Sequence, residues 1–166
     1  MVAGRPSGVR LDPDSPGPII QVIEDIDDRG RLDFPPRVAE YVDWLSKRAT
    51  QCLMVLREPG RLELLCWDTA GIQVIERRRQ IAEAARSDSS LWEALRNLED
   101  RYHRLPLTAD RRKISLGANA LLHLGIPEKV FSQVYLIGFP DRIGVLSPLR
   151  RNELIQEIPA ILSDLP

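Results

Sequence analysis

The chain contains little of several features that mark particular protein classes. Its 166 residues include 2 cysteines, and aromatic residues make up 5%. Two cysteines cannot build the disulfide framework of a small secreted domain, so we expect a reducing, cytoplasmic compartment. The formal net charge of −1 excludes a basic field over the whole domain. Binding to nucleic acid would therefore need a local basic patch, with acidic residues segregated elsewhere.

Long apolar runs and catalytic signatures are missing as well. No run of about 18 or more apolar residues occurs, and there is no apolar signal-peptide core, so we expect neither a membrane span nor secretion. The spacing of cysteine and histidine matches no metal site, and no nucleophile elbow, P-loop or zinc-protease motif is present. We therefore expect a protein that is not an enzyme and uses no cofactor or metal; an enzyme of another kind is a third-ranked alternative.

The sequence does have the composition of a globular protein, with 43% hydrophobic and 28% charged residues. Residues 1–18 are rich in proline and glycine, which predicts a flexible tail. Alternating and β-branched residues then predict strands at 19–23 and 31–34, joined by a turn at 27–30. Proline at positions 35 and 36 ends the second strand and opens a short helix.

Further elements follow from turn chemistry and periodicity. A hairpin is predicted over 52–67, because Pro59 and Gly60 suit its turn. An irregular helix is expected over about 72–86. The next helix is expected to start with a capping box of Ser90 and Glu93. Its apolar face should carry Leu91, Leu95, Leu98 and Tyr102.

The same order of elements then recurs in the second half of the chain. The sequence predicts a strand at 105–108, a turn at 109–112, a strand at 113–116, a helix at 118–124 and a hairpin at 134–146. A final helix is expected to start at Ser147. Asp28 precedes Asp110 by 82 residues, and Pro59 precedes Pro140 by 81. Two landmarks with nearly equal offsets indicate an internal duplication.

The duplication predicts a fold class. One unit alone would bury too little apolar surface, and pairing two units into one closed β-structure also removes exposed strand edges. We therefore expect an α+β, mainly β, pseudo-two-fold barrel with helices between and after the repeats. The expected segments are 19–86 for the first repeat and its following helix, 87–104 for a connecting helix, and 105–166 for the second repeat and C-terminal helix, with both repeats in one domain.

Residues 27–35, DDRGRLDFP, resemble the D-x-K-G-R-hydrophobic-x-hydrophobic-P signature of the MraZ family, within the AbrB-like swapped-hairpin superfamily. Residues 134–143 resemble the hairpin that follows the second MraZ motif, and the resemblance spans about 19–155. It implies a bacterial transcription regulator whose two hairpins interlock into one barrel. It also implies that the basic motif residues face double-stranded DNA and that the protein forms homo-oligomers.

The resemblance assigns roles to individual residues. Asp27, Gly30 and Pro35 take the structural turn positions of the first motif, and Arg29 and Arg31 its basic positions. The second motif is divergent: Ala109 stands at the aspartate position, Arg112 at the glycine and Gly117 at the proline. The residues expected to contact DNA are Arg29, Arg31, Arg37, Arg111, Arg112 and Lys113. Bidentate arginine contacts suit phosphates and guanine edges.

Other interpretations stay open at this point. The basic hairpin residues could be ordinary solvated side chains, and the barrel could be a protein-interaction module that has lost DNA binding, such as an antitoxin-like partner or an assembly subunit. The run 76–79, ERRR, fits a solvated helix face or an additional phosphate-contacting patch. Cys52 and Cys66 are expected to be buried and inert. If the protein binds DNA, it would be associated with the nucleoid.

Overall fold

The computed structural model describes residues 20–45, 49–108, 112–127, 129 and 131–147. These residues form eight strands, four α-helices and one π-helical turn. The strands are β1 (Ile20–Ile26), β2 (Arg31–Asp33), β3 (Gln51–Leu56), β4 (Arg61–Cys66), β5 (Tyr102–Pro106), β6 (Lys113–Ser115), β7 (Ser132–Gly138) and β8 (Arg142–Leu146). The helices are α1 (Pro36–Tyr41), α2 (Ile72–Ala84), α3 (Leu91–Arg101) and α4 (Ala118–Leu124), with the π-helical turn at Trp67–Gly71.

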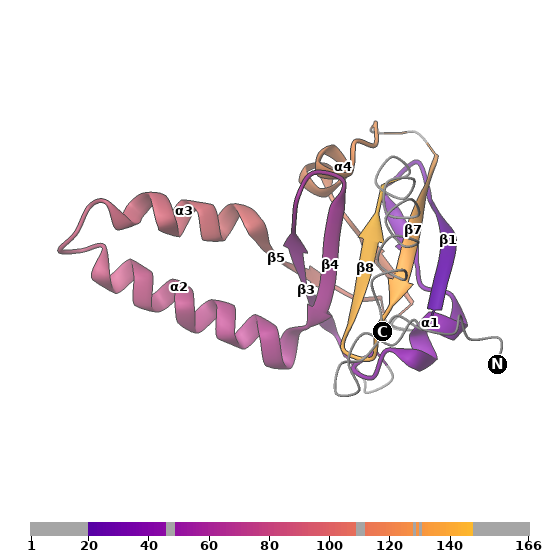
Figure 1. Cartoon of the computed structure of the whole chain (residues 1–166), viewed down its shortest axis with the longest axis horizontal. Coiled ribbons are helices and arrows are strands. Elements are labelled where there is room, and N and C mark those ends of the chain that lie inside the picture. The colour runs from indigo at the N-terminus through magenta and orange to yellow at the C-terminus, as the bar shows by residue number, and fades with distance from the viewer. Residues whose placement is uncertain (1–19, 46–48, 109–111, 128, 130, 148–166) are drawn as a thin grey trace, which may run out of the picture.

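The strands form one antiparallel sheet in the order β5-β3-β4-β8-β7-β1-β2-β6. The two end strands, β5 and β6, approach each other, because the Thr108 N–H donates to the Lys113 carbonyl at 3.1 Å just after β5. The sheet is therefore a nearly closed barrel (Figure 1). The expected α+β, mainly β class is confirmed.

The barrel interior is filled by aliphatic side chains, as the low aromatic content requires. Alternate residues of each strand point inward, so Leu32, Leu62 and Leu136 are fully buried. Short helices lie near the two ends of the barrel, α4 at the upper end and α1 at the lower end of Figure 1. Val38 of α1 and Ala120 of α4, which are 82 residues apart, are both fully buried.

The two predicted hairpins are confirmed, β3–β4 and β7–β8. Gly60 takes a φ of 88° in the first turn, as a glycine at that turn position allows. The helical segment of each half contacts the hairpin turn of the other half. The Gly60 N–H donates to the His123 carbonyl at 2.8 Å, and the Trp44 indole N–H donates to the Asp141 carbonyl at 2.9 Å.

The helices α2 and α3 pair as an arm that projects from the barrel (Figure 1). The helix predicted over about 72–86 is confirmed as α2. The predicted capping box is wrong, because Ser90 has helical backbone angles and makes no side-chain cap bond. Its hydroxyl instead donates to Asp88 Oδ1 at 2.6 Å.

The strand after the arm begins earlier than the sequence predicted. Tyr102, expected on the apolar face of the helix, is the first residue of β5 and pairs with Val55 of β3. Pairing along the whole of β3 outweighs the helical periodicity at this boundary. The predicted tail at 1–18 lies outside the described residues, and so does the final helix beyond Ser147.

Candidate nucleic-acid interface

The strip formed by β2 and β6 carries Arg31 and Lys113, two of the six basic residues that the sequence singled out. Leu32 and Ile114 face each other at its centre and point into the core, with exposed fractions of 0% and 2%. Their neighbours therefore point outward, because side chains alternate along a strand. The four outward residues are all exposed: Arg31, Asp33, Lys113 and Ser115.

The register of this strip relates its two halves. Arg31 pairs with Ser115, and Asp33 pairs with Lys113. Adding 82 to the residue number leads from Arg31 to Lys113 and from Asp33 to Ser115. The two residue pairs are therefore equivalent under the repeat. Arg31 and Lys113 are thus diagonal neighbours, about 7–8 Å apart between Cα atoms, and both side chains are 46% exposed.

The first turn, between β1 and β2, is organised by the Asp27 carboxylate. Oδ1 accepts the backbone N–H groups of Arg29 at 2.9 Å and Arg31 at 3.0 Å, and Oδ2 accepts the Arg31 Nε–H at 2.8 Å. These bonds, led by the one from the Arg31 backbone, lower the pKa of Asp27. Asp27 therefore fixes the turn and also orients the Arg31 guanidinium.

Gly30 completes this turn with a positive φ of 75°. Its N–H donates to the Asp27 carbonyl at 3.0 Å, and a Cβ added to it would lie 3.1 Å from Leu121 Cδ1. The glycine is thus needed for the backbone angle and for the close approach of α4. Pro35, also expected at a structural position, precedes α1 with a φ of −58°.

The connection between β5 and β6 is organised in a similar way by a different side chain. The Lys113 N–H donates to Thr108 Oγ1 at 3.2 Å, and the Thr108 N–H donates to the Lys113 carbonyl. The first turn has the same two bonds: the Arg31 N–H donates to Asp27 Oδ1, and the Asp27 N–H donates to the Arg31 carbonyl at 3.1 Å. Thr108, not Ala109, therefore takes the place of Asp27, and one more residue separates it from Lys113. A side-chain oxygen five residues before Lys113 was the signal that the sequence analysis missed.

The position of Arg112 agrees with the motif alignment. The Phe34 N–H donates to the Arg112 carbonyl at 2.6 Å, and the Leu116 N–H donates to the Gly30 carbonyl at 3.0 Å. A shift of 82 residues exchanges these two bonds, so Arg112 corresponds to Gly30. Unlike Gly30, Arg112 does not have a positive φ. Among the described residues other than glycine, the one with a positive φ is Lys129. The neighbouring Arg111 lies outside the described residues.

The structure brings the basic residues to two ends of one strip. Arg29 belongs to the first turn, next to α4, and is exposed. Arg37, also exposed, follows Phe34 by three residues and so belongs to the end that carries Arg112. Within the described part of the chain, neither Arg29 nor Arg37 has an ion pair.

Part of the positive charge is compensated within the strip. Asp27 pairs with Arg31 at 2.8 Å, and Asp33 pairs with Lys113 at 3.7 Å. Both pairs are exposed, so they are weak and can exchange for an external anion. The strip thus combines fixed geometry at Arg31 with cations at its ends.

A buried carboxylate occupies the far side of the barrel, and the sequence analysis did not single it out. Glu63 of β4 has a side chain that is 9% exposed, and it lies between two arginines. Oε1 accepts from Arg57 at 2.7 Å, and Oε2 accepts from Arg142 at 3.2 Å. These two bonds tie the carboxylate of β4 to Arg142 of β8 and to Arg57, the residue that follows β3.

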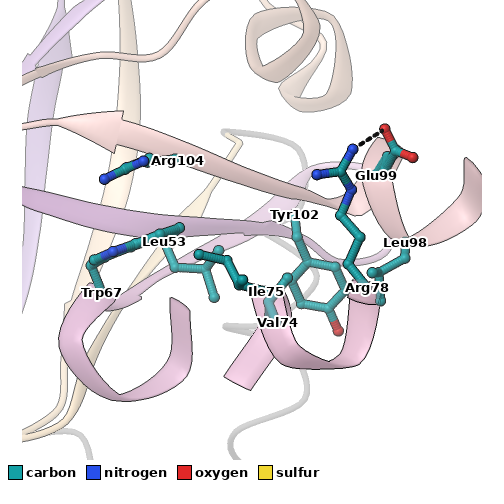
Figure 2. A pocket seen from close by; sticks show the side chains of 9 residues that line it. All are labelled: Leu53, Trp67, Val74, Ile75, Arg78, Leu98, Glu99, Tyr102 and Arg104. Atoms are coloured by element: carbon teal, nitrogen blue, oxygen red, sulfur yellow. Dashed lines mark ion pairs between the residues drawn. The ribbon is translucent and has the colours of Figure 1, made fainter. Parts of the chain in front are cut away.

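A hollow lies where the arm meets the barrel (Figure 2). This cleft has a volume of about 310 Å³ and is lined mainly by apolar side chains, with the Arg104 guanidinium 4.6 Å from the centre of the Trp67 ring. Its outer edge carries an ion pair between Arg78 and Glu99 at 3.6 Å.

The run 76–79 forms part of the exposed surface of α2, as one of the two sequence interpretations expected. Arg79 bonds Glu76 and Glu83 on its own helix, so its charge is used locally. Among the described residues, no group of three potential ligands could hold a metal ion. The helices in this part of the chain are also too short or too polar to cross a membrane.

Searches of protein-family models and of curated proteins find no match for this chain.

Proposed function

We propose that this chain is a sequence-specific, DNA-binding transcription regulator of the MraZ type, with two AbrB-like hairpin repeats in one swapped-hairpin barrel. The observation that carries the proposal is the β2–β6 register. It sets Arg31 and Lys113 diagonally on an exposed strip, and the same 82-residue shift relates the two backbone bonds at its ends, Phe34 to Arg112 and Leu116 to Gly30. A duplicated unit accounts for this arrangement, and the crossed contacts at Gly60 and Trp44 fit interlocked halves.

The strip has the properties that a duplex demands. Positive side chains at Arg29, Arg31, Arg112 and Lys113 follow one line across the barrel surface, where each can reach a phosphate. A line of cations suits the regular negative charge of DNA, and the formal net charge of −1 for the whole chain means that binding would rely on such a local patch. The planar guanidinium of Arg31, held by Asp27, is preorganised for bidentate contacts to a guanine edge.

The proposal is tested by fluorescence anisotropy of the full chain with random duplex DNA over a series of salt concentrations. We expect affinity to fall with salt at a slope of about −0.9 per neutralised phosphate. The double variant Arg29→Ala with Arg31→Ala should abolish this binding. The matched control, Arg77→Ala with Arg86→Ala, removes the same charge from the arm and should bind like the wild type.

Two outcomes would contradict the proposal. One is the absence of binding even at low salt; the other is equal loss of binding in the strip variant and in the arm control. Circular dichroism of both variants checks that the barrel is folded. Specificity is then tested by selection from a random oligonucleotide pool, which should enrich a defined sequence.

The second candidate is a protein-interaction module, and the arm favours it. Ile72, Ile75 and Trp92 are 54%, 52% and 47% exposed, which leaves large apolar side chains in water on both helices of the arm. Such side chains suit self-association or a protein partner. Recovery of one stoichiometric protein partner by a chain that ignores DNA would favour this candidate over the first.

A further inference from the structure

Cys52 and Cys66 lie directly opposite each other on β3 and β4. In an antiparallel pair of strands, hydrogen-bonded and non-hydrogen-bonded residue pairs alternate. The Arg57 N–H donates to the Arg61 carbonyl at 3.1 Å, which makes these two residues a hydrogen-bonded pair. Cys52 of β3 lies five residues before Arg57, and an odd number of steps leads to the other kind of pair. The cysteines are therefore a non-hydrogen-bonded pair, in which the side chains are closest.

This position satisfies the geometry of a disulfide. Cα atoms of a non-hydrogen-bonded pair are about 4.5 Å apart, within the range of about 4.4–6.8 Å that a disulfide spans. Both side chains lie on the same face of the ladder, because directly opposed residues share a face. Both also pack against the barrel core, and both are free thiols in this structure.

The two thiols differ in access. Cys52, the second residue of β3, is fully buried, and burial raises its pKa to about 12. Cys66 is the last residue of β4 and is partly exposed, next to the π-helical turn that starts at Trp67. An oxidant from solvent therefore reaches Cys66 first, and Cys52 is the neighbour that can trap the product.

We propose that Cys52 and Cys66 are an oxidation site, where hydrogen peroxide converts the two thiols into a reversible cross-strand disulfide. The Cys66 sulfur attacks a peroxide oxygen, the O–O bond breaks, and a sulfenic acid and one water form. The Cys52 sulfur then attacks the Cys66 sulfur, the S–O bond breaks, and the departing hydroxide takes the Cys52 proton as a second water. Two thiols lose two electrons and two protons, and the peroxide is reduced.

The disulfide would link β3 to the end of β4, the point at which the chain leaves the barrel and enters the arm. Residue 66 is the last residue before the π-helical turn, so the bridge fixes the strand end at the base of α2. Closing a hairpin-sized loop restricts the unfolded chain, and we expect the thermal midpoint to rise by about 5 °C or more. A thiol reductant should reverse the rise.

The test is treatment of the full-length protein with hydrogen peroxide, followed by alkylation in denaturant and intact-mass analysis. The expected product is a monomer that has lost two hydrogen atoms, takes up no alkylating reagent and regains two reactive thiols after reduction. Peptide mapping should join the peptides that contain Cys52 and Cys66. Because Cys52 is a scarce thiolate, formation should accelerate as the pH is raised.

The variant Cys66→Ser is the matched control, because its site is only partly buried and the hydroxyl can be solvated. It should form no intramolecular bridge, and its thermal midpoint should not respond to peroxide. Two alkylatable thiols in the peroxide-treated wild type would overturn the proposal, as would a bridge between molecules or accumulation of sulfinic acid. None of these readouts involves DNA, so their failure leaves the proposed function untouched.

Discussion

The β1–β2 turn and its counterpart, the connection between β5 and β6, are called the first and second hairpins below. They solve one structural problem with different residues. In the first, a carboxylate at Asp27 accepts two backbone N–H groups, and Gly30 supplies a positive φ. In the second, the hydroxyl of Thr108 accepts one N–H group, and Arg112 takes the place of the glycine without a positive φ. One more residue separates Thr108 from Lys113 than separates Asp27 from Arg31.

The difference shows which features of the turn are interchangeable. A side-chain oxygen at the start of the turn and a bond across the strip are kept, whereas the glycine is replaced once the connection is longer. The second hairpin thereby gains a cation, since an arginine stands where the first has no side chain. If both hairpins contact DNA, we expect them to contribute unequally, the first through a preorganised guanidinium and the second through charge.

The largest effect should separate the two hairpins by DNA affinity. Arg29→Ala with Arg31→Ala removes the oriented guanidinium, so we expect complete loss of specific binding. Arg112→Ala with Lys113→Ala should weaken binding to all sequences about equally and lower the magnitude of the salt slope by about 2. Anisotropy titrations on specific and random duplexes measure both. Identical behaviour of the two double variants would remove the distinction between the hairpins.

The next effect should appear in stability at the glycine position. Gly30→Ala places a Cβ on a residue with positive φ and within 3.1 Å of Leu121 Cδ1. We expect a loss of about 1–2 kcal/mol in the free energy of unfolding, from the left-handed backbone alone. Urea denaturation measures it.

The matched substitution in the second hairpin is Arg112→Gly. It introduces freedom at a position whose φ is already ordinary, so it should cost less than Gly30→Ala. A cost for Arg112→Gly equal to or above that of Gly30→Ala would contradict the assignment of strain to the first turn only.

The third effect concerns acid. The pKa of Asp27 is lowered by hydrogen bonds that the unfolded chain lacks, so its contribution to stability is present at neutral pH. That contribution is lost as the pH falls through the lowered pKa. Asp27→Asn, which carries no charge, should therefore show a smaller drop in urea midpoint between pH 7 and strong acid than the wild type does. An unchanged drop would show that the carboxylate does not stabilise the turn.

Turn chemistry and apolar alternation let the sequence predict the strands of both hairpins, the β3–β4 and β7–β8 turns and α4. These features depend on neighbouring residues, so a local pattern is sufficient. The start of β5 was mispredicted, because Tyr102 fits a helix locally and is drawn into a strand by β3. The role of Thr108 was missed for a related reason. The motif places the turn-forming oxygen four residues before the basic residue, whereas Thr108 makes the equivalent bond to Lys113 from five residues before it.

For the candidate site, the sequence predicted the basic residue types but could not predict their partners. Arg31 bonds Asp27 within its own turn, whereas Lys113 faces Asp33 only because of the register of two strands 82 residues apart. The projection of the arm is also a tertiary property. Periodicity predicts each helix, but not that α2 buries none of its described side chains.

The smallest effect should be found at Thr108, and it tests whether the two turns are truly equivalent. Thr108→Val keeps the shape of the side chain and removes the oxygen that accepts the Lys113 N–H. Because this bond is exposed and water can replace it, we expect a loss of at most about 0.5–1 kcal/mol by urea denaturation. Thr108→Asp restores an acceptor and adds the charge that the first turn has. If the turns are equivalent, Thr108→Asp should regain the stability lost in Thr108→Val. Its urea midpoint should also fall in acid, as we expect for the contribution of Asp27 in the wild type. A Thr108→Asp variant no more stable than Thr108→Val would mean that the longer connection, and not the side chain, holds the second turn.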